Sequence, residues 1–521
     1  MAYNITVTAG ERFNKSYAEY KETWEKCEDF YLGGLNVTAA DKKALYLPRH
    51  ISESIEQYNN RVQSVYYDNK IKEPLDSLFA FIFSSRLITR SGGDFLGDMK
   101  DSFLDDVDGK GSDIRAFMTE VSKWAAVHGV CYIYIEPPYM NASQQKETVS
   151  MQDIKNNNIL PLFHIIKRCQ VCDWSHGSDG MPTMVKIRFE KLVRDAKTDI
   201  EKAEPFYLRW EKIPDSNKCQ WAYFSASEMI LNDWTVVDIP FIPIVAKYGI
   251  KKADFVGLPL VQDCADIANA IYINDNRTED FLAYAAHCQL VCAVANDEEA
   301  KALSNVKRGN QYIMTFPSGA VPPQYLAISQ APFISLSEQK NKLVQAIYQN
   351  LKQRLQDLST AQTTNSGESK KQDWKVTSAE LSNLAHTIQE CENMAYFIQM
   401  LWLKNDIQSA IDSQITVFYP DVYEVNTTTE ELEELQIKRS MGFPKTYLKA
   451  KIKQIIEADP IYALLSEEEK EEIENELYME TIKESAAVGL DEKGVEEISN
   501  QMKAMQEEDD TMSELAEQPK E

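Results

Sequence analysis

The chain has 521 residues, 44% of them hydrophobic, and a net charge of −26. This length allows several domains and a large core, and the hydrophobic fraction excludes wholesale disorder. The negative charge argues against a simple high-affinity nucleic-acid binder. It is also uneven, because residues 457–521 hold 22 acidic and 5 basic residues, a net of −17, which leaves −9 for the first 456 residues.

The sequence shows no pattern of export or membrane insertion. The first residues, MAYNITVTAGERFNK, lack the basic and then apolar order of a signal peptide. The best apolar run, 75–88, is broken by Asp76 and by serines and is too short to span a bilayer. Nine cysteines lie scattered without the spacing of a disulfide framework. We therefore expect a soluble protein of a reducing cytoplasm.

The first half of the chain predicts helices followed by an antiparallel sheet. Residues 55–70 and 73–86 read as helices, and 112–129 as a further helix with Ser112 as its N-cap and Gly129 as its stop. An apolar run that ends in prolines predicts a strand at 130–138. Alternation of apolar and polar residues predicts strands at 184–193 and 206–211, with 219–225 as a neighbouring strand.

The second half predicts long helices around a small mixed unit. A helix over 260–286 precedes two short strands, 289–296 and 311–319, with a helix between them. A second helix opens at the capping box Ser335–Glu338, and a third at Thr377–Glu380, running to about Ser413 with a length of roughly 55 Å. Between these two helices lies the polar stretch 357–375, which has no apolar rhythm. A strand at 415–420 and acidic helical residues from Thr427 onward complete the chain.

One group of residues has the chemistry of a metal site. Cys169, Cys172 and His176 have the spacing of three zinc ligands, and a structural site wants a fourth, from Cys219 or His164. The alternative is that these are strand and turn cysteines beside a packed Trp174. Cys288 and Cys292 leave a similar choice between buried thiols and a metal or redox pair.

Other functional motifs are absent from the sequence or incomplete. DVDGKGSD (106–113) begins like a calcium loop, but its twelfth position is Phe117 rather than Glu, so a tight turn is the better interpretation. The phosphate-binding, dinucleotide-binding, nucleophile-elbow and zinc-protease motifs do not occur, and the six histidines are dispersed. We expect no enzyme activity, no cofactor and no metal.

Several short motifs, in this order, resemble the portal protein, or head-to-tail connector, of tailed bacteriophages. They are Tyr46-Leu47-Pro48, Tyr58-x-x-Arg61, the helix that ends near Phe83, and the run from Phe103 to Pro138 with its Asp-Gly-x-Gly turn. The segment around Trp174 and the later helix, small unit and helix continue the resemblance over roughly residues 40 to 450.

The resemblance implies an α+β, elongated subunit of a ring of about twelve copies. It assigns residues 1–256 to a wing of helices and antiparallel sheet, 257–284 and 335–357 to paired stem helices, and 285–334 to a small α+β clip. Residues 358–376 become a tunnel loop that hangs into a central channel. Residues 377–425 supply a long wing helix and a strand, and 426–521 a helical crown with an acidic tail.

The resemblance also implies a function. The ring would sit at one capsid vertex of the virion after assembly in the host cytoplasm, and would conduct double-stranded DNA during genome packaging and ejection. Its partners would be the terminase large subunit, head-completion adaptors at the clip, and the major capsid protein, with no membrane. Lys307 and Arg308 are the candidates for contact at the clip.

The tunnel-loop interpretation agrees with simple physics. A stretch of 19 residues has a contour of about 60 Å, enough to reach inward from a ring wall. We expect Lys370, Lys371, Trp374 and Lys375 to lie near DNA, with a charge weak enough to let the duplex slide. A disordered linker without DNA contact is the alternative. The acidic tail is either a solubilising face or a surface that repels packaged DNA.

Two other functions remain open at this point. One is a metal-dependent nucleic-acid enzyme that uses the Cys169, Cys172 and His176 cluster. The other is a monomeric helical scaffold or adaptor protein.

Overall fold

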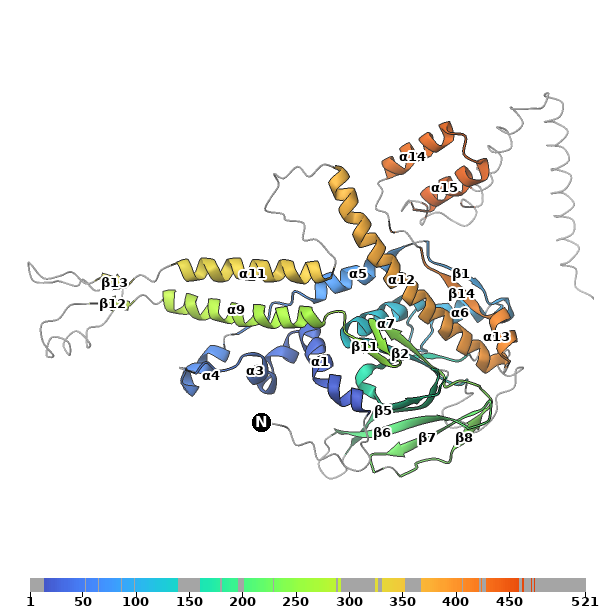
Figure 1. The fold of residues 1–521 in the computed structure, drawn as a ribbon, viewed down its shortest axis with the longest axis horizontal. Coiled ribbons are helices and arrows are strands. Elements are labelled where there is room, and N and C mark those ends of the chain that lie inside the picture. Colours follow the sequence, from blue (N-terminus) through green and yellow to red (C-terminus); the bar gives the residue numbers. More distant parts are fainter. Residues whose placement is uncertain are drawn as a thin grey trace, which may run out of the picture. The chain divides into compact units, whose positions relative to one another are not determined.

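The computed structural model describes residues 14–138, 160–194, 201–291, 324–326, 330–351 and 367–458, apart from some single positions and from 287–288, 421–422 and 424–427, together with residues 462, 470 and 473. The chain divides into two compact units, Met1–Tyr423 and Glu424–Glu521. Figure 1 shows the elements of both. No helix among the described residues is both long and apolar enough to cross a membrane.

The first unit opens with helices, most of which pack on one hydrophobic core, while Tyr17 and Trp24 of the first helix lie in a second core. These helices are α1 (Lys15–Leu32), α2 (Leu35–Thr38), α3 (Ala40–Tyr46), α4 (Ile55–Gln63), α5 (Lys72–Ser84) and α6 (Met99–Asp105). Leu75, Leu78, Phe79 and Ile82 on α5 recur at three- and four-residue spacing and are buried in the first core. Helix α4 is shorter than the helix predicted over 55–70, since residues 65–70 are not helical.

A three-stranded sheet lies at the centre of the unit. Its antiparallel strands run in the order β3 (Phe163–Lys167), β2 (Val130–Ile135), β9 (Ile244–Tyr248). All of β2 is buried, because Cys131, Ile133 and Ile135 face one hydrophobic core while Tyr132 and Tyr134 face the second. Burial on both faces explains why β2 is an unbroken apolar run rather than an alternating one.

Helix α7 (Ile114–His128) leads directly into β2 through Gly129. Gly129 has φ 81°, and a Cβ there would lie 2.4 Å from the carbonyl oxygen of Gly257. Gly257 belongs to β11 (Val256–Leu258), which pairs with β10 (Ile250–Ala253). Only glycine allows this close approach, so the predicted stop at Gly129 is confirmed and has a packing reason.

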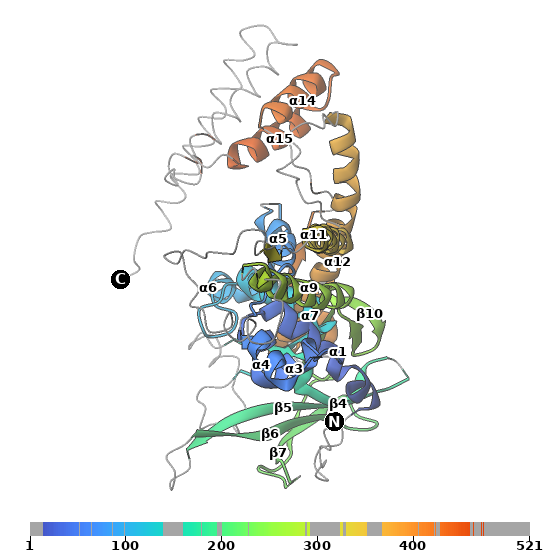
Figure 2. The ribbon, with the colours of Figure 1, turned by 90° about the vertical axis from the view of Figure 1, so that its left-hand side faces the viewer.

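A five-stranded antiparallel sheet covers the second core, and Figure 2 shows its strands β5 to β7 lying beneath the helices. Its strands, in spatial order, are β4 (Val171–His176), β5 (Pro182–Arg194), β6 (Glu201–Lys212), β7 (Cys219–Ser225) and β8 (Thr235–Val237). Val185, Trp210 and Trp221 are aligned across it and buried. The predicted antiparallel sheet is confirmed, and the fold combines helices with antiparallel strands as expected for the α+β class.

The remaining elements of the first unit are long helices and small strand pairs. They are α9 (Gln262–Ala286), β12 (Gln289–Val291), β13 (Gln324–Leu326), α11 (Ala331–Asn350), α12 (Gly367–Lys404), α13 (Ile407–Ser413), and the pair β1 (Thr89–Gly92) and β14 (Ile415–Phe418). The second unit contains α14 (Thr428–Ser440) and α15 (Lys445–Ala458).

The predicted first residues of α7 and α11 are wrong. A tight turn precedes α7, and a proline lies in the first turn of α11. The N-cap of α7 is Asp113, whose carboxylate accepts the N–H of Ala116 at 2.6 Å, while Ser112 belongs to the preceding turn through the N–H of Val107. Helix α11 begins at Ala331 rather than Ser335, since Pro332 is favourable in a first turn.

The bounds of α12 also differ from the prediction. It begins at Gly367, not at the Thr377 capping box, so 367–376 are helical and not part of a loop. These residues are mostly good helix formers, and a helical stretch without an apolar stripe gives no periodic signal. At the other end α12 stops at Lys404, because Asp406 caps the separate helix α13 through the N–H of Ser409.

Candidate functional site

Helices α9 and α11 form an antiparallel pair, the stem, which leaves the body of the first unit with β12 and β13 beyond it (Figure 1). Cys264 contacts the carbonyl oxygen of Ile347 where the pair meets the body. Further out, Asn274 donates to the carbonyl oxygen of Leu336 at 3.1 Å. Phe281 then stacks on Phe333, with ring centres 6.4 Å apart. Contacts at these three levels keep the two helices in one register.

A partly buried cluster of charges ties the stem to the body, with Asp275 as its buried member. Lys340 of α11 lies 2.9 Å from Asp275 of α9 and 3.3 Å from Asp68, which precedes α5. Burial raises the pKa of Asp275, and Lys340 offsets part of that rise. Burial by itself lowers the pKa of Lys340, but the two carboxylates outweigh it and raise the value overall. Lys340 is therefore a charged brace between three segments.

A second brace lies beside the first. Arg61 of α4 donates to Glu53 with two nitrogens, at 2.7 and 2.9 Å, and also contacts the side-chain oxygen of Asn276 on α9. This two-point geometry fixes the guanidinium plane. The direction of the stem is thus set by charged and polar contacts and not by apolar packing alone.

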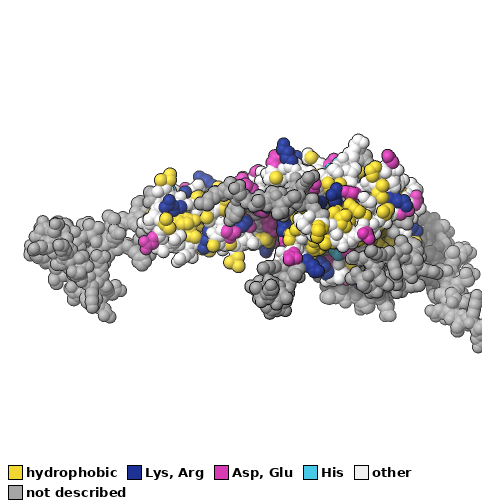
Figure 3. Space-filling view, turned by 90° about the horizontal axis from the view of Figure 1, so that it is seen from below, with side chains coloured by type: hydrophobic (Ala, Val, Ile, Leu, Met, Phe, Trp, Pro, Cys, Tyr) yellow, Lys and Arg dark blue, Asp and Glu magenta, His cyan; other side chains and the backbone are white. Residues whose placement is uncertain are grey.

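Much of the stem surface is uncovered in the single chain. The side chains of Leu282 and Ile334, near the far end of the stem, are 41% and 52% exposed. Figure 3 shows hydrophobic, basic and acidic side chains side by side along this part of the molecule. Counted from the sequence, α9 carries a net charge of −4 and α11 a net charge of +1. The stem is therefore weakly acidic, with apolar residues left to be covered.

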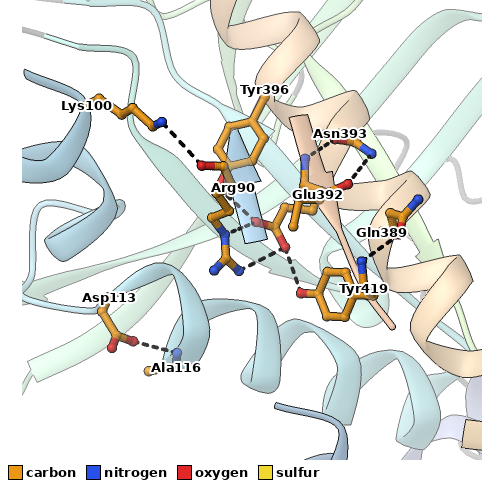
Figure 4. A network of polar contacts seen from close by, with 10 residues as sticks. Arg90, Lys100, Asp113, Ala116, Gln389, Glu392, Asn393, Tyr396 and Tyr419 are labelled. Atoms are coloured by element: carbon orange, nitrogen blue, oxygen red, sulfur yellow. Dashed lines mark hydrogen bonds and ion pairs between the residues drawn. The ribbon is translucent and has the colours of Figure 1, made fainter. Parts of the chain in front are cut away.

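A buried polar network fixes helix α12 to the strand pair β1–β14 (Figure 4). Glu392 of α12 is 0% exposed and pairs with Arg90 of β1 at 2.7 Å. It also accepts hydrogen bonds from Tyr396 and from Tyr419, each at 2.8 Å. Burial by itself lowers the pKa of Arg90, but Glu392 reverses this and raises it, so the guanidinium stays charged.

Two amides of α12 take the place of a neighbouring strand along β14. Asn393 accepts the N–H of Val417 at 2.8 Å and donates to its carbonyl oxygen at 3.2 Å. Gln389 accepts the N–H of Tyr419 at 2.8 Å. These bonds satisfy backbone groups that an edge strand leaves open. The C-terminal half of α12 is therefore rigidly seated in the first unit.

The four predicted DNA-proximal residues lie at the beginning of this same helix. Lys370, Lys371, Trp374 and Lys375 belong to the first turns of α12 and not to a free loop. Positions 370 and 374, and likewise 371 and 375, are four residues apart, so the four positions share one side of the helix. The structure thus gathers them on a helix whose other end is anchored by Glu392. Residues 358–366, and Lys307 and Arg308 of the clip, lie outside the described residues.

The structure does not bring together Cys169, Cys172 and His176, the candidates for a zinc site. Cys169 lies in a short 3₁₀ turn before β4, the side chain of Cys172 contacts the carbonyl oxygen of Gln170, and the His176 ring packs on Phe255 at 5.0 Å. Within the part of the chain that the structure describes, no three His, Cys, Asp or Glu side chains are grouped to hold a metal ion. Cys288 and Cys292 lie outside that part.

The calcium-like turn also has an internal explanation. Asp106 accepts the N–H of Gly111, and Asp108 accepts the N–H groups of Lys110 and Ser112. These bonds lower the pKa of Asp108 although burial by itself would raise it. The carboxylates hold the tight turn before α7, as the sequence predicted.

The sequence reasoning missed the anchoring residues. Glu392 falls between Ile388 and Ala395 on the apolar side of α12, and an acid on an apolar helix face indicates a buried partner. The partner, Arg90, is distant in the sequence and carries no signal of its own. Asp275 on α9 is a second such acid.

Comparisons with known proteins give structural neighbours but no family. No protein-family model and no curated protein matches the chain. Among solved structures it is similar to a chain in the neck of an empty GTA particle computed with C6 symmetry, with 12% identity, 79% of this chain and 96% of that chain covered, and a TM-score of 0.42. It is also similar to a chain in the neck of a native GTA particle computed with C12 symmetry, with 13% identity, coverages of 78% and 89%, and a TM-score of 0.37.

Proposed function

We propose that this chain is the subunit of a ring-shaped portal at one vertex of a phage-like capsid. The ring conducts double-stranded DNA during packaging and ejection and performs no chemistry itself. The observation that carries the proposal is the braced stem, α9 and α11, which leaves the body with apolar residues uncovered on its far part. Copies of the same chain, related by rotation, cover such surfaces in a closed ring.

The charges support a conduit rather than a tight DNA binder. Each stem carries a net charge of −3, so a ring of stems presents an acidic wall to the duplex. Every phosphate that a basic residue neutralises steepens binding and its salt dependence, which would hinder sliding. Lys370, Lys371, Trp374 and Lys375, at the start of α12, provide brief contact at a constriction formed with residues 358–366.

The proposed partners follow from the same arrangement. The clip, assigned to residues 285–334, docks the terminase large subunit during filling and the head-completion adaptors afterwards. Lys307 and Arg308 contribute to that contact. The major capsid protein holds the outside of the ring, so that the finished protein belongs to the virion after assembly in the host cytoplasm.

Native mass spectrometry tests the proposal directly. A ring of about twelve chains of 59.5 kDa has a mass of about 714 kDa. Negative-stain images of the same sample must show a central hole. A species with the mass of one chain contradicts the proposal and favours the monomeric scaffold, and one tightly bound zinc per chain favours the metal-dependent enzyme.

A further inference from the structure

The second unit contains a basic helical hairpin within a strongly acidic chain. Residues 435–456, which include the end of α14 and most of α15, hold six basic and no acidic residues. The basic residues are Lys438, Arg439, Lys445, Lys449, Lys451 and Lys453. In a chain of net charge −26 this segment is a concentrated positive surface.

The hairpin is a defined structure rather than a floppy connection. Gly442, with φ 76°, ends α14, and the N–H of Phe443 reaches back to the carbonyl oxygen of Lys438 at 3.2 Å. Lys438 donates to the Tyr447 hydroxyl at 3.0 Å and pairs with Glu434 at 2.7 Å. The positive charges are therefore held on two fixed helices.

The same hairpin leaves apolar side chains uncovered. Ile437, Met441, Phe443 and Tyr447 are between 40% and 70% exposed. Two short helices cannot bury a core by themselves. The uncovered part of the hairpin is thus apolar, and it lies on the same two helices that carry the basic residues.

The chain that follows has the matching composition. Residues 467–480, EEEKEEIENELYME, contain eight acidic residues and one basic residue, a net of −7 against +6 for the hairpin segment. Ile473 and Leu477 are four residues apart, as on one face of a helix, and Ile473 is half-buried. Both the charge and the apolar residues therefore complement α14 and α15.

The linker 459–466 is long enough for the acidic segment 467–480 to fold back onto α14 and α15. Residues 459–466 reach at most about 30 Å, whereas α15 is about 20 Å long. The Lys470 ammonium already lies 5.9 Å from the ring of Tyr462, just after α15. A tether of this length gives an effective concentration of about a millimolar or more, which disfavours external anions as competitors.

We propose that the acidic segment 467–480 packs across α14 and α15 of its own chain, with its carboxylates on the hairpin lysines and Ile473 and Leu477 on the exposed apolar residues. The acidic run thus has a specific intrachain site, distinct from a solvated or DNA-repelling tail. The inference does not depend on the proposed portal function, since all of its elements lie in the second unit.

Charge reversal in the full chain tests this site. One variant carries Lys449→Glu, Lys451→Glu and Lys453→Glu, a second carries Glu467→Lys, Glu468→Lys and Glu469→Lys, and a third combines all six changes. We expect each triple variant to speed hydrogen exchange of 467–480 by about fivefold or more, and the combined variant to recover most of the protection. The matched control, Glu507→Lys, Glu508→Lys and Asp509→Lys, leaves exchange of 467–480 unchanged.

Further readouts keep the test decisive. Hydrogen exchange of α14 reports whether charge reversal unfolds the hairpin. In that case the milder variant Lys449→Gln/Lys451→Gln/Lys453→Gln replaces it, and it should also speed exchange of 467–480 while exchange of α14 stays unchanged. The proposal fails if 467–480 exchanges without protection in the wild type, or if the two triple variants have no effect on its exchange. It also fails if the effects of the two triple variants add in the combined variant instead of cancelling. If the protection of 467–480 returns only when chains of the two triple variants are mixed, the segment packs on a neighbouring copy of the chain. A mixed-sequence DNA duplex that binds the hairpin in the wild-type chain assigns the surface to nucleic acid. Either result overturns the intrachain site.

Discussion

At the scale of single residues, the first unit depends on charged groups that are buried with a designated partner. Glu392 has Arg90 and two tyrosine hydroxyls, and Asp275 has Lys340. A buried charge that loses its partner is strongly destabilising, whereas removal of both partners is often tolerated. These residues are therefore where a single substitution has the largest effect.

Glu392→Gln is expected to lower the free energy of unfolding of the first unit by about 3–5 kcal/mol, because Arg90 keeps its charge in a buried site without a carboxylate. Urea denaturation followed by tryptophan fluorescence measures the change. The double variant Arg90→Met/Glu392→Leu recovers most of the loss. A loss of less than about 1 kcal/mol for Glu392→Gln would show that the network contributes little.

Lys247 of β9 is a second buried basic group, but no carboxylate among the described residues forms an ion pair with it. It is 3% exposed and donates to the Thr387 hydroxyl at 2.7 Å and to the Tyr248 carbonyl oxygen at 3.0 Å. Burial lowers its pKa from 10.5 to about 8. As pH falls from 10.5 toward 8, the unfolded chain binds a proton that the folded chain does not. The folded state therefore loses stability over this interval, and below it the loss is constant.

Lys247→Met should remove this pH dependence. At neutral pH we expect the variant to be more stable than the wild type by about 2–3 kcal/mol, and the difference to shrink as pH rises toward 10.5. Urea denaturation at a series of pH values measures it. A difference that stays constant across the interval would mean that Lys247 is charged in the folded protein throughout.

At the scale of elements, the stem is a helix pair whose direction is set at its root. Lys340 joins α11 to α9 and to Asp68, and Arg61 joins α4 to α9. Farther out the pair is held by Asn274 and by the Phe281–Phe333 contact. Loss of the root brace should therefore loosen the stem without unfolding the sheets.

Lys340→Ala is expected to speed hydrogen exchange around Asp275 in α9 and around position 340 in α11 by about tenfold, because Asp275 is left buried without its cation. Exchange in β2 and β5 should not change. The control Lys342→Ala removes an exposed lysine of the same helix and should have no such effect. Equal exchange in the two variants would exclude a bracing role for Lys340.

At the scale of the whole molecule, the proposed ring would bring many copies of the start of α12 around one channel. The triple variant Lys370→Gln/Lys371→Gln/Lys375→Gln should leave the native mass unchanged. Its binding of duplex DNA should depend less on salt, with a log–log slope smaller by up to about 0.9 for each phosphate that is no longer neutralised. The control Lys21→Gln/Lys72→Gln/Lys110→Gln changes three lysines of the wing instead. An identical slope for both variants would contradict DNA contact at residues 370–375.

Local patterns predicted the elements whose own residues carry the signal. The apolar spacing of Ile114, Phe117 and Val121 predicted α7, and alternation around Val185 and Ile187 predicted β5, because burial on one face imposes a period. The antiparallel sheet and the long helices followed in the same way. The start of α12 was missed, because residues 367–376 form a helix without an apolar face.

The amino-acid sequence by itself determined the local elements of this protein and the separation of its charge into a basic hairpin segment and an acidic tail. The tertiary structure alone decided which distant residues meet: Arg90 with Glu392, Lys340 with Asp275 and Asp68, and Lys247 with Thr387. The physical reason is that a helix or strand reports its period within a few residues. A buried polar group, in contrast, needs a partner that packing can bring from anywhere in the chain.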